Sequence, residues 1–297
     1  MPSSTKRRRW LPLLLLAVLI AVGLPYGCSR LAYKERELIF SIEPGTARWF
    51  NGLPSGLQEL NIPIDNALSK DQYLHAWWWP AQHPNATTVL YLHGMRWNLT
   101  AQVRRITNLH DMGFAVLAID YRGFGQSPGD VPSEHSVYED AQVAWERVAQ
   151  LQPDPGKRMI YGHSLGGAIG VELAERINKK QAPPAAGLII ESTFTDMGAA
   201  AQAVIKTSLP VRWILSEKFD SIDKIADIGM PVLIVHGSAD QYVPPHFSEE
   251  LFKAAADPKR LLLVPGGNHN DTMNLGRRQY AEAIRQLFNV EADIDAG

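Results

Sequence analysis

Short apolar runs recur along the chain, and each one closes on a glycine or a polar residue. Six of them occupy residues 88–94, 115–120, 158–164, 187–192, 231–237 and 260–267. Near-continuous apolar runs of this length are typical of parallel strands that are covered on both faces. Two earlier segments, residues 57–64 and 72–79, have the pattern of strands on either side of a polar turn.

Amphipathic segments separate these runs. Residues 137–151 and 168–180 carry apolar side chains at helical spacing. Regular alternation of strand and helix predicts an α/β chain, in which helices cover both faces of a doubly wound, mostly parallel sheet. In such sheets, function gathers at the carboxyl ends of the strands. We therefore search for chemistry at the ends of the apolar runs.

The N-terminus has a different pattern. Residues 10–27 include no charged side chain and follow the basic cluster KRRR at residues 6–9. Such a run is about long enough to span a bilayer, for which roughly 20 residues are needed. A secretory signal is the alternative, and Cys28 directly after the run also allows a cleaved, acylated lipoprotein. We favour an uncleaved anchor, because Pro25 and Tyr26 stand where lipoprotein signals carry leucine and a small residue.

The distribution of charge predicts how the chain is oriented in the membrane and which class of partner it does not bind. The basic cluster should stay on the cytoplasmic side, which places the body of the chain outside the cytoplasm, at the periplasmic face of the inner membrane in a bacterium. Removing those four residues from the 29 basic ones leaves 25 against 31 acidic residues. Because nucleic-acid binding usually needs a basic face, this mildly acidic body predicts no nucleic-acid partner. A single cysteine excludes an intrachain disulfide.

The end of one apolar run carries a candidate nucleophile. Residues 160–168 read IYGHSLGGA, so a G-x-S-x-G pentapeptide lies between a predicted strand and a predicted helix. Glycines at 162 and 166 allow the sharp turn that would present Ser164 at its tip. The helix would bring the N–H of Leu165 and its positive end beside the hydroxyl. An ordinary glycine turn with a solvated serine is the alternative.

A serine hydroxyl needs a base, and the base needs an acid to orient it. Of nine histidines, His269 lies in a glycine-rich loop after the last apolar run, where it could reach back over Ser164. Asp240 follows the run at 231–237 and is the first candidate acid, and Glu191 is the second. The order serine, aspartate, histidine is that of α/β hydrolases.

Attack on a carbonyl also needs two hydrogen-bond donors, already in position, to stabilise the negative charge that develops on the carbonyl oxygen. The N–H groups of Met95, after the Gly94 turn, and of Leu165 are the natural pair. The sequence contains no phosphate-loop, dinucleotide or metal-ligand pattern, so no cofactor and no metal are expected.

The blocks YLHGM, AIDYRGFGQSPG, GHSLGG, IIESTFTDM, HGSADQYVP and GGNHND, in this order, resemble those of the α/β-hydrolase superfamily over about residues 57–288. More narrowly, the chain resembles the membrane-anchored, Bem46-like and serine aminopeptidase-like branch. The resemblance implies a small lid of one or two short helices within residues 193–230. It also implies these roles: nucleophile Ser164, acid Asp240, base His269, and oxyanion donors Met95 and Leu165.

Three segments are expected: an anchor or signal at 1–28, a connecting region at 29–56 and a catalytic domain at 57–290. The leading hypothesis is a membrane-anchored serine hydrolase that cleaves small acyl esters, thioesters or lipid-like substrates through an acyl-enzyme. The apolar stretch at 208–219 could line an acyl site or pack on the sheet. One alternative is a peptidase that removes N-terminal residues. The other is a protein with the hydrolase fold that binds a partner or a lipid at the membrane and catalyses no reaction.

Overall fold

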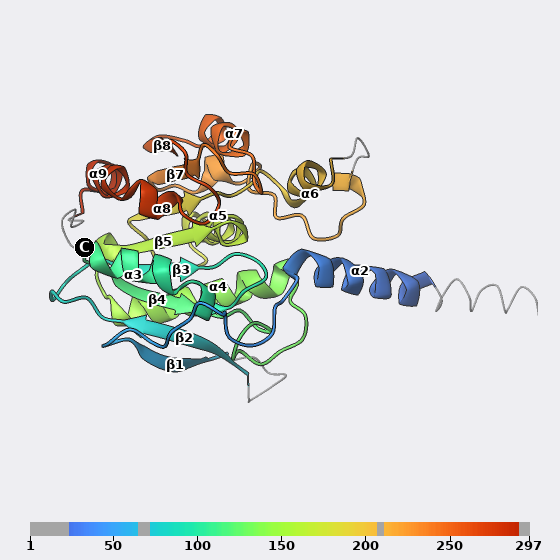
Figure 1. Ribbon diagram of the computed structural model, residues 1–297, viewed down its shortest axis with the longest axis horizontal. Helices are drawn as coiled ribbons and strands as arrows, with labels where there is room; N and C mark the ends of the chain where they lie inside the picture. Colours follow the sequence, from blue (N-terminus) through green and yellow to red (C-terminus); the bar gives the residue numbers. More distant parts are fainter. Residues whose placement is uncertain (1–23, 65–71, 207–210, 291–297) are drawn as a thin grey trace, which may run out of the picture.

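The computed structural model describes residues 24–64, 72–206 and 211–290, which form one eight-stranded sheet in the order β1-β2-β4-β3-β5-β6-β7-β8 (Figure 1). β1 and β2 are antiparallel to their neighbours, and all the other pairs are parallel. The predicted mostly parallel sheet is therefore confirmed. The strands are β1 (Gln58–Pro63), β2 (Tyr73–Trp79), β3 (Thr88–Leu92), β4 (Ala115–Ile119), β5 (Arg158–His163), β6 (Gly187–Glu191), β7 (Val232–Gly237) and β8 (Lys259–Val264).

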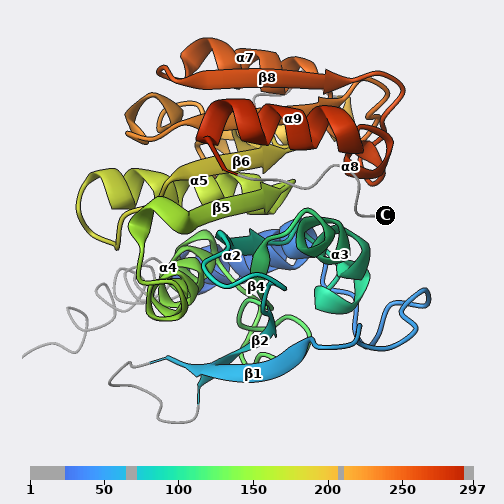
Figure 2. The ribbon, with the colours of Figure 1, turned by 90° about the vertical axis from the view of Figure 1, so that its left-hand side faces the viewer.

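Helices cover both faces of the sheet, as Figure 2 shows. Alternate side chains of each buried strand join opposite cores: Leu90 of β3 belongs to one core and its neighbour Val89 to the other. This double burial explains why the central strands are apolar at every position. The helices are α2 (Leu24–Phe40), α3 (Val103–Asp111), α4 (Glu134–Leu151), α5 (Leu165–Asn178), α6 (Met197–Ile205), α7 (His246–Ala254), α8 (Thr272–Leu275) and α9 (Arg277–Phe288).

Helix α2 projects from the body of the molecule toward the side that also carries α6 (Figure 1). The helix runs without a break across residue 28, where we had placed the start of a connecting region. Its last residue, Phe40, is fully buried among Phe124 and Phe219, with ring centroids 6.2 Å from each. The first part of the connecting region is thus a helix whose end packs on the body of the molecule.

The lid lies between β6 and β7 and follows the expectation of short helical pieces. It contains α6 and two single turns of 3-10 helix, η4 (Val211–Trp213) and η5 (Ile225–Asp227). The carboxylate of Glu35 on α2 accepts hydrogen bonds from the Ser216 N–H, the Ser216 hydroxyl and the Glu217 N–H, at 2.7, 2.9 and 2.9 Å. Helix α2 and the lid are therefore joined directly.

The described part of the chain has no helix that is both long and apolar enough to cross a membrane. The predicted anchor at residues 10–27 lies outside the described residues, apart from its last four positions at the start of α2.

Candidate active site

Ser164 stands at the sharp turn between β5 and α5, as the pentapeptide predicts. Its φ of 56° and ψ of −121° lie in a region that costs a non-glycine residue free energy, and such strain is commonly found at functional sites. A Cβ on Gly162 would lie 2.1 Å from the Gly166 carbonyl oxygen, and one on Gly166 would lie 2.0 Å from that of Leu92. Both glycines are therefore required by close backbone contact, which holds Ser164 at the tip.

His269 and Asp240 are joined at the neighbouring strand ends. Nδ1 of His269 lies 2.7 Å from Oδ2 of Asp240, while Oδ1 accepts the N–H groups of Tyr242 and Val243 at 2.9 and 3.0 Å. Burial opposes ionisation of the carboxyl, but hydrogen bonds from His236 and His269 outweigh it and lower the pKa of Asp240. An ionised Asp240 can keep the proton on Nδ1 and leave Nε2 free to accept one.

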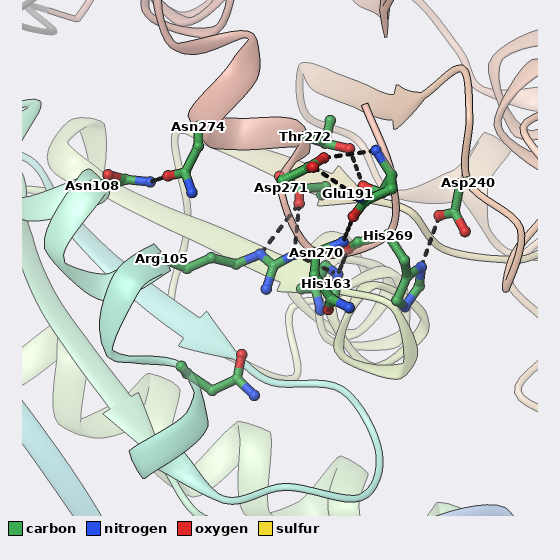
Figure 3. Close-up of polar contacts among 12 residues, drawn as sticks. Arg105, Asn108, His163, Glu191, Asp240, His269, Asn270, Asp271, Thr272 and Asn274 are labelled. Atoms are coloured by element: carbon green, nitrogen blue, oxygen red, sulfur yellow. Dashed lines mark hydrogen bonds and ion pairs between the residues drawn. The ribbon is translucent and has the colours of Figure 1, made fainter. Parts of the chain in front are cut away.

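Glu191, our second candidate acid, has other partners. Its side chain is fully buried and accepts hydrogen bonds from the hydroxyls of Tyr161 and Tyr280 at 2.6 and 2.8 Å. It also pairs with Arg105 at 3.2 Å (Figure 3). Burial, together with the charge of Glu191, holds the pKa of both phenols well above its usual value, so they remain donors. Glu191 therefore holds Arg105 rather than the imidazole of His269.

Arg105 links buried Glu191 to the loop that carries His269. Its Nη2 donates to the backbone carbonyl of His269 at 2.9 Å and lies 2.9 Å from Nε2 of His163 (Figure 3). Burial disfavours a charged guanidinium, but the Glu191 carboxylate outweighs it and raises the pKa of Arg105. Burial and the charge of Arg105 lower the pKa of His163 well below its usual value, so that ring is neutral. Nε2 of His163 also lies 2.9 Å from the backbone carbonyl oxygen of His269, so this nitrogen faces one group that only donates and one that only accepts.

The loop after β3 lies against the serine turn. A Cβ on Gly94 would be 3.2 Å from the Cβ of Ser164, so glycine lets the two turns meet. The loop is held in turn by α2 and the segment after it: the Arg96 N–H donates to the Phe40 carbonyl at 2.9 Å, and the Arg96 guanidinium pairs with Glu43 at 3.0 Å. The loop that carries Met95 therefore lies against the turn of Ser164.

A cavity of about 1170 Å³ opens over these groups. Ser164 and His269 line it, although no hydrogen bond joins their side chains among the described residues. Its walls are mostly apolar and come from α2, the loop after β3, α3, the lid, the loops after β7 and β8, and α8. Among the residues described, no group of three histidine, cysteine or carboxylate side chains could hold a metal ion. The apolar lining residues include Leu31, Leu38, Ile39, Trp49, Met95, Trp97, Val103, Phe194, Met197, Val204, Ile205, Val211, Ile214, Leu215, Val243 and Met273.

The sheet order, the strained serine turn and the lid together define an α/β hydrolase. The family described as "Serine aminopeptidase, S33" matches residues 83–223. A protein of Mycobacterium tuberculosis is 34% identical over 292 residues, which cover 97% of this chain and 98% of that protein. The chain therefore belongs to the α/β-hydrolase superfamily.

Two further comparisons agree with this assignment. The mouse protein named "Lysophosphatidylserine lipase ABHD12" is 32% identical over 205 residues, covering 64% of this chain and 50% of that protein. Among solved structures, an esterase of Pyrococcus furiosus superposes with a TM-score of 0.64 at 16% identity, covering 83% of this chain and 98% of that one. The second likeness supports the fold alone.

Two parts of the site were missed by sequence reasoning. Arg105 lies within an amphipathic helix, and its partner Glu191 is 86 residues away, so no local pattern pairs them. Helix α2 was treated as part of the anchor and a connector, although its apolar side chains line the cavity. The available signal for a helix was the recurrence of apolar residues such as Leu31 and Leu38 at helical spacing among charged ones.

Proposed function

We propose that the protein is a serine hydrolase that cleaves carboxylic esters or thioesters bearing an apolar acyl group. One observation supports this most strongly: Ser164, held at a strained turn, shares an apolar cavity with the imidazole of the His269–Asp240 pair. Esters and thioesters fit better than amides because their leaving groups depart more readily. The lipase name of one relative is consistent with an acyl substrate.

The proposed reaction proceeds in two displacements. Ser164 Oγ attacks the acyl carbonyl carbon while Nε2 of His269 takes the hydroxyl proton. The N–H groups of Met95 and Leu165 stabilise the negative oxygen of the tetrahedral intermediate. The intermediate collapses, the bond to the alcohol or thiol breaks, and His269 returns the proton to that leaving group. Water, deprotonated by His269, then releases the carboxylic acid and regenerates Ser164.

Hydrolysis of a series of acyl esters and thioesters by the full chain tests this proposal. Ser164→Ala should lower kcat/KM by at least ~10³-fold without loss of the folded state. Ser55→Ala, at an exposed serine in the turn before β1, is the matched control and should leave the rate unchanged. Full activity in Ser164→Ala would overturn the assignment. Aminoacyl amides belong in the same series, because turnover of amides without esters would identify a peptidase instead.

We also propose that residues 10–27 anchor the enzyme and that its catalytic domain lies outside the cytoplasm. The support is the charge-free run and the preceding basic cluster, since a charge at mid-membrane costs roughly 2.5–3.5 kcal/mol on insertion scales. Protease added to spheroplasts should digest the catalytic domain of a bacterial host's enzyme. Protection of the domain, while a periplasmic control protein is cut, would contradict this orientation.

A further inference from the structure

We propose that α2 and the lid together form a docking surface for a lipid bilayer, through which the acyl substrate enters the cavity from the membrane. The surface, called here the α2–lid rim, comprises Leu31, Leu38, Val204, Ile205, Trp213 and Ile214. This inference deepens the proposed function, because it concerns how the same cavity is filled. It predicts a physical contact with lipid that can be measured without any turnover.

The exposure of the large apolar side chains of the α2–lid rim is the first observation that supports this inference. Its side chains are unusually exposed for their type: Trp213 is 86% exposed, Leu38 80% and Ile214 71%. Scattered exposed apolar residues are normal, but a gathering of large ones marks an interaction surface. These come from two elements, α2 and the lid, that the Glu35 hydrogen bonds join. Figure 1 shows α2 and α6 on the same side of the molecule.

The rim also borders the active site. Every rim residue except Trp213 lines the cavity that contains Ser164 and His269. An acyl chain that leaves a membrane pressed against the rim would therefore meet a continuous apolar path to the nucleophile. A protein partner on the same surface would instead cover the entrance to the cavity.

The neighbouring sequence and charge favour a bilayer as the occupant. The charge-free run at residues 10–27 leads directly into α2, whose first turn it supplies. Two exposed cations, Arg30 and Lys206, flank rim residues and make no ion pair in the part of the chain that the structure describes. Lysine and arginine beside apolar side chains are the usual composition of a membrane-surface helix, where they contact anionic headgroups.

Acidic groups near the rim are already engaged. Glu35 accepts the lid hydrogen bonds, and Glu37 pairs with Lys34 on the same helix. Asp220 and Asp223 both pair with Arg212. Arg30 and Lys206, which are exposed and have no acidic partner among the described residues, are the groups that can contact anionic headgroups.

Lipid contact can be measured in the full chain reconstituted into vesicles. In a Cys28→Ser background, Leu38→Cys or Ile214→Cys carries a small fluorophore, and Leu275→Cys is the control. Leu275 is also exposed, at 58%, but lies on α8, far from α2 in Figure 1. The vesicles contain phosphatidylcholine with brominated acyl chains, with or without phosphatidylglycerol. Both rim positions should be quenched and Leu275 should not, and phosphatidylglycerol should increase the quenching.

Equal quenching at rim and control positions would overturn the proposal. So would rim fluorescence that responds to protein concentration and not to brominated lipid, because that result would indicate a second copy of the chain. Since neither readout depends on catalysis, an inactive enzyme that is quenched at the rim would reject the proposed function and retain the docking surface.

A kinetic test uses Trp213, which belongs to the rim but does not line the cavity. Trp213→Asp should lower turnover of a long-chain ester embedded in vesicles by roughly tenfold, because a large buried aromatic contact with lipid is lost. Turnover of a soluble short-chain ester should not change, and Leu275→Asp should change neither rate. Equal losses on both substrates in Trp213→Asp would contradict docking.

Discussion

Two buried carboxylates at neighbouring strand ends, Asp240 and Glu191, differ in what they hold. Asp240 contacts the imidazole of His269, whereas Glu191 neutralises Arg105 and accepts two phenol hydrogen bonds. The first arrangement is the one that the proposed base needs, and the second keeps a charge in the protein interior. The same residue class is thus assigned to chemistry at one position and to stability at the other.

Substitutions at these two carboxylates should fail in different ways. Asp240→Asn should lower kcat by about 10⁴-fold with little change in unfolding, because the imidazole loses its required tautomer. Glu191→Gln should instead cost about 3–5 kcal/mol of stability, because Arg105 is left as an uncompensated buried charge. Kinetics and urea unfolding of both variants provide the measurement. A Glu191→Gln variant as stable as the parent would refute the structural role, and recovery with Arg105→Met would support it.

At the scale of elements, α2 links the active-site loop to the lid. Its C-terminal carbonyl at Phe40 holds Arg96, and its Glu35 holds Ser216 and Glu217. The lid therefore depends on a helix that begins the described chain. Removing α2 should leave the cavity without one wall.

Glu35→Ala should loosen the lid. The variant loses three hydrogen bonds, each of which typically contributes about 1 kcal/mol. Amide exchange at Ser216 and Glu217 should therefore be faster by roughly tenfold or more. Glu37→Ala is the matched control, since Glu37 pairs only with Lys34 on its own helix among the described residues. Hydrogen exchange followed by mass spectrometry reports both variants. Equal exchange of the lid in the two would mean that Glu35 does not hold it.

A second histidine–carboxylate cluster, which the sequence did not indicate, joins β1, β2 and the end of β4. His75 is buried, with Nδ1 3.0 Å from Asp120 and Nε2 3.1 Å from Glu59. Burial lowers the pKa of His75, but the two carboxylates outweigh it and raise that pKa overall. Because the folded state favours the protonated ring, its stabilisation is complete below the ordinary imidazole pKa and is lost as pH rises through the folded value.

His75→Gln should therefore destabilise the protein more at about pH 5.5 than at about pH 8.5. Urea unfolding of the parent and the variant at both pH values gives the comparison. An equal penalty at both would show that protonation of His75 contributes nothing to folding.

At the scale of the whole molecule, we expect the size and lining of the cavity to set the preferred acyl chain length. An apolar space of about 1170 Å³ exceeds what a short acyl group fills. Each buried methylene contributes about 0.8 kcal/mol, so kcat/KM should rise roughly fourfold per added methylene until the chain fills the cavity. A series of straight-chain esters at concentrations below micelle formation measures this. A rate that falls steadily from the shortest ester would contradict an acyl-binding cavity.

Much of this architecture could be predicted because its signals are local. Apolar runs closed by glycine mark the buried strands, and the turn at Gly162 and Gly166 follows from a pattern of five residues. The missing parts depend on distant pairs: Glu35 meets Ser216 across 181 residues, and Arg105 meets Glu191 across 86. Such pairs appear only once the chain is folded, since nothing in either segment specifies the other.

The most direct measurement of the proposed serine chemistry is covalent labelling by a fluorophosphonate, with the modified residue located by tandem mass spectrometry. The folded protein should form one adduct, at Ser164, and His269→Ala should slow its formation by orders of magnitude while keeping the unfolding transition. A folded protein that forms no adduct at Ser164, or one that is labelled equally fast in His269→Ala, would contradict a nucleophilic serine at this turn.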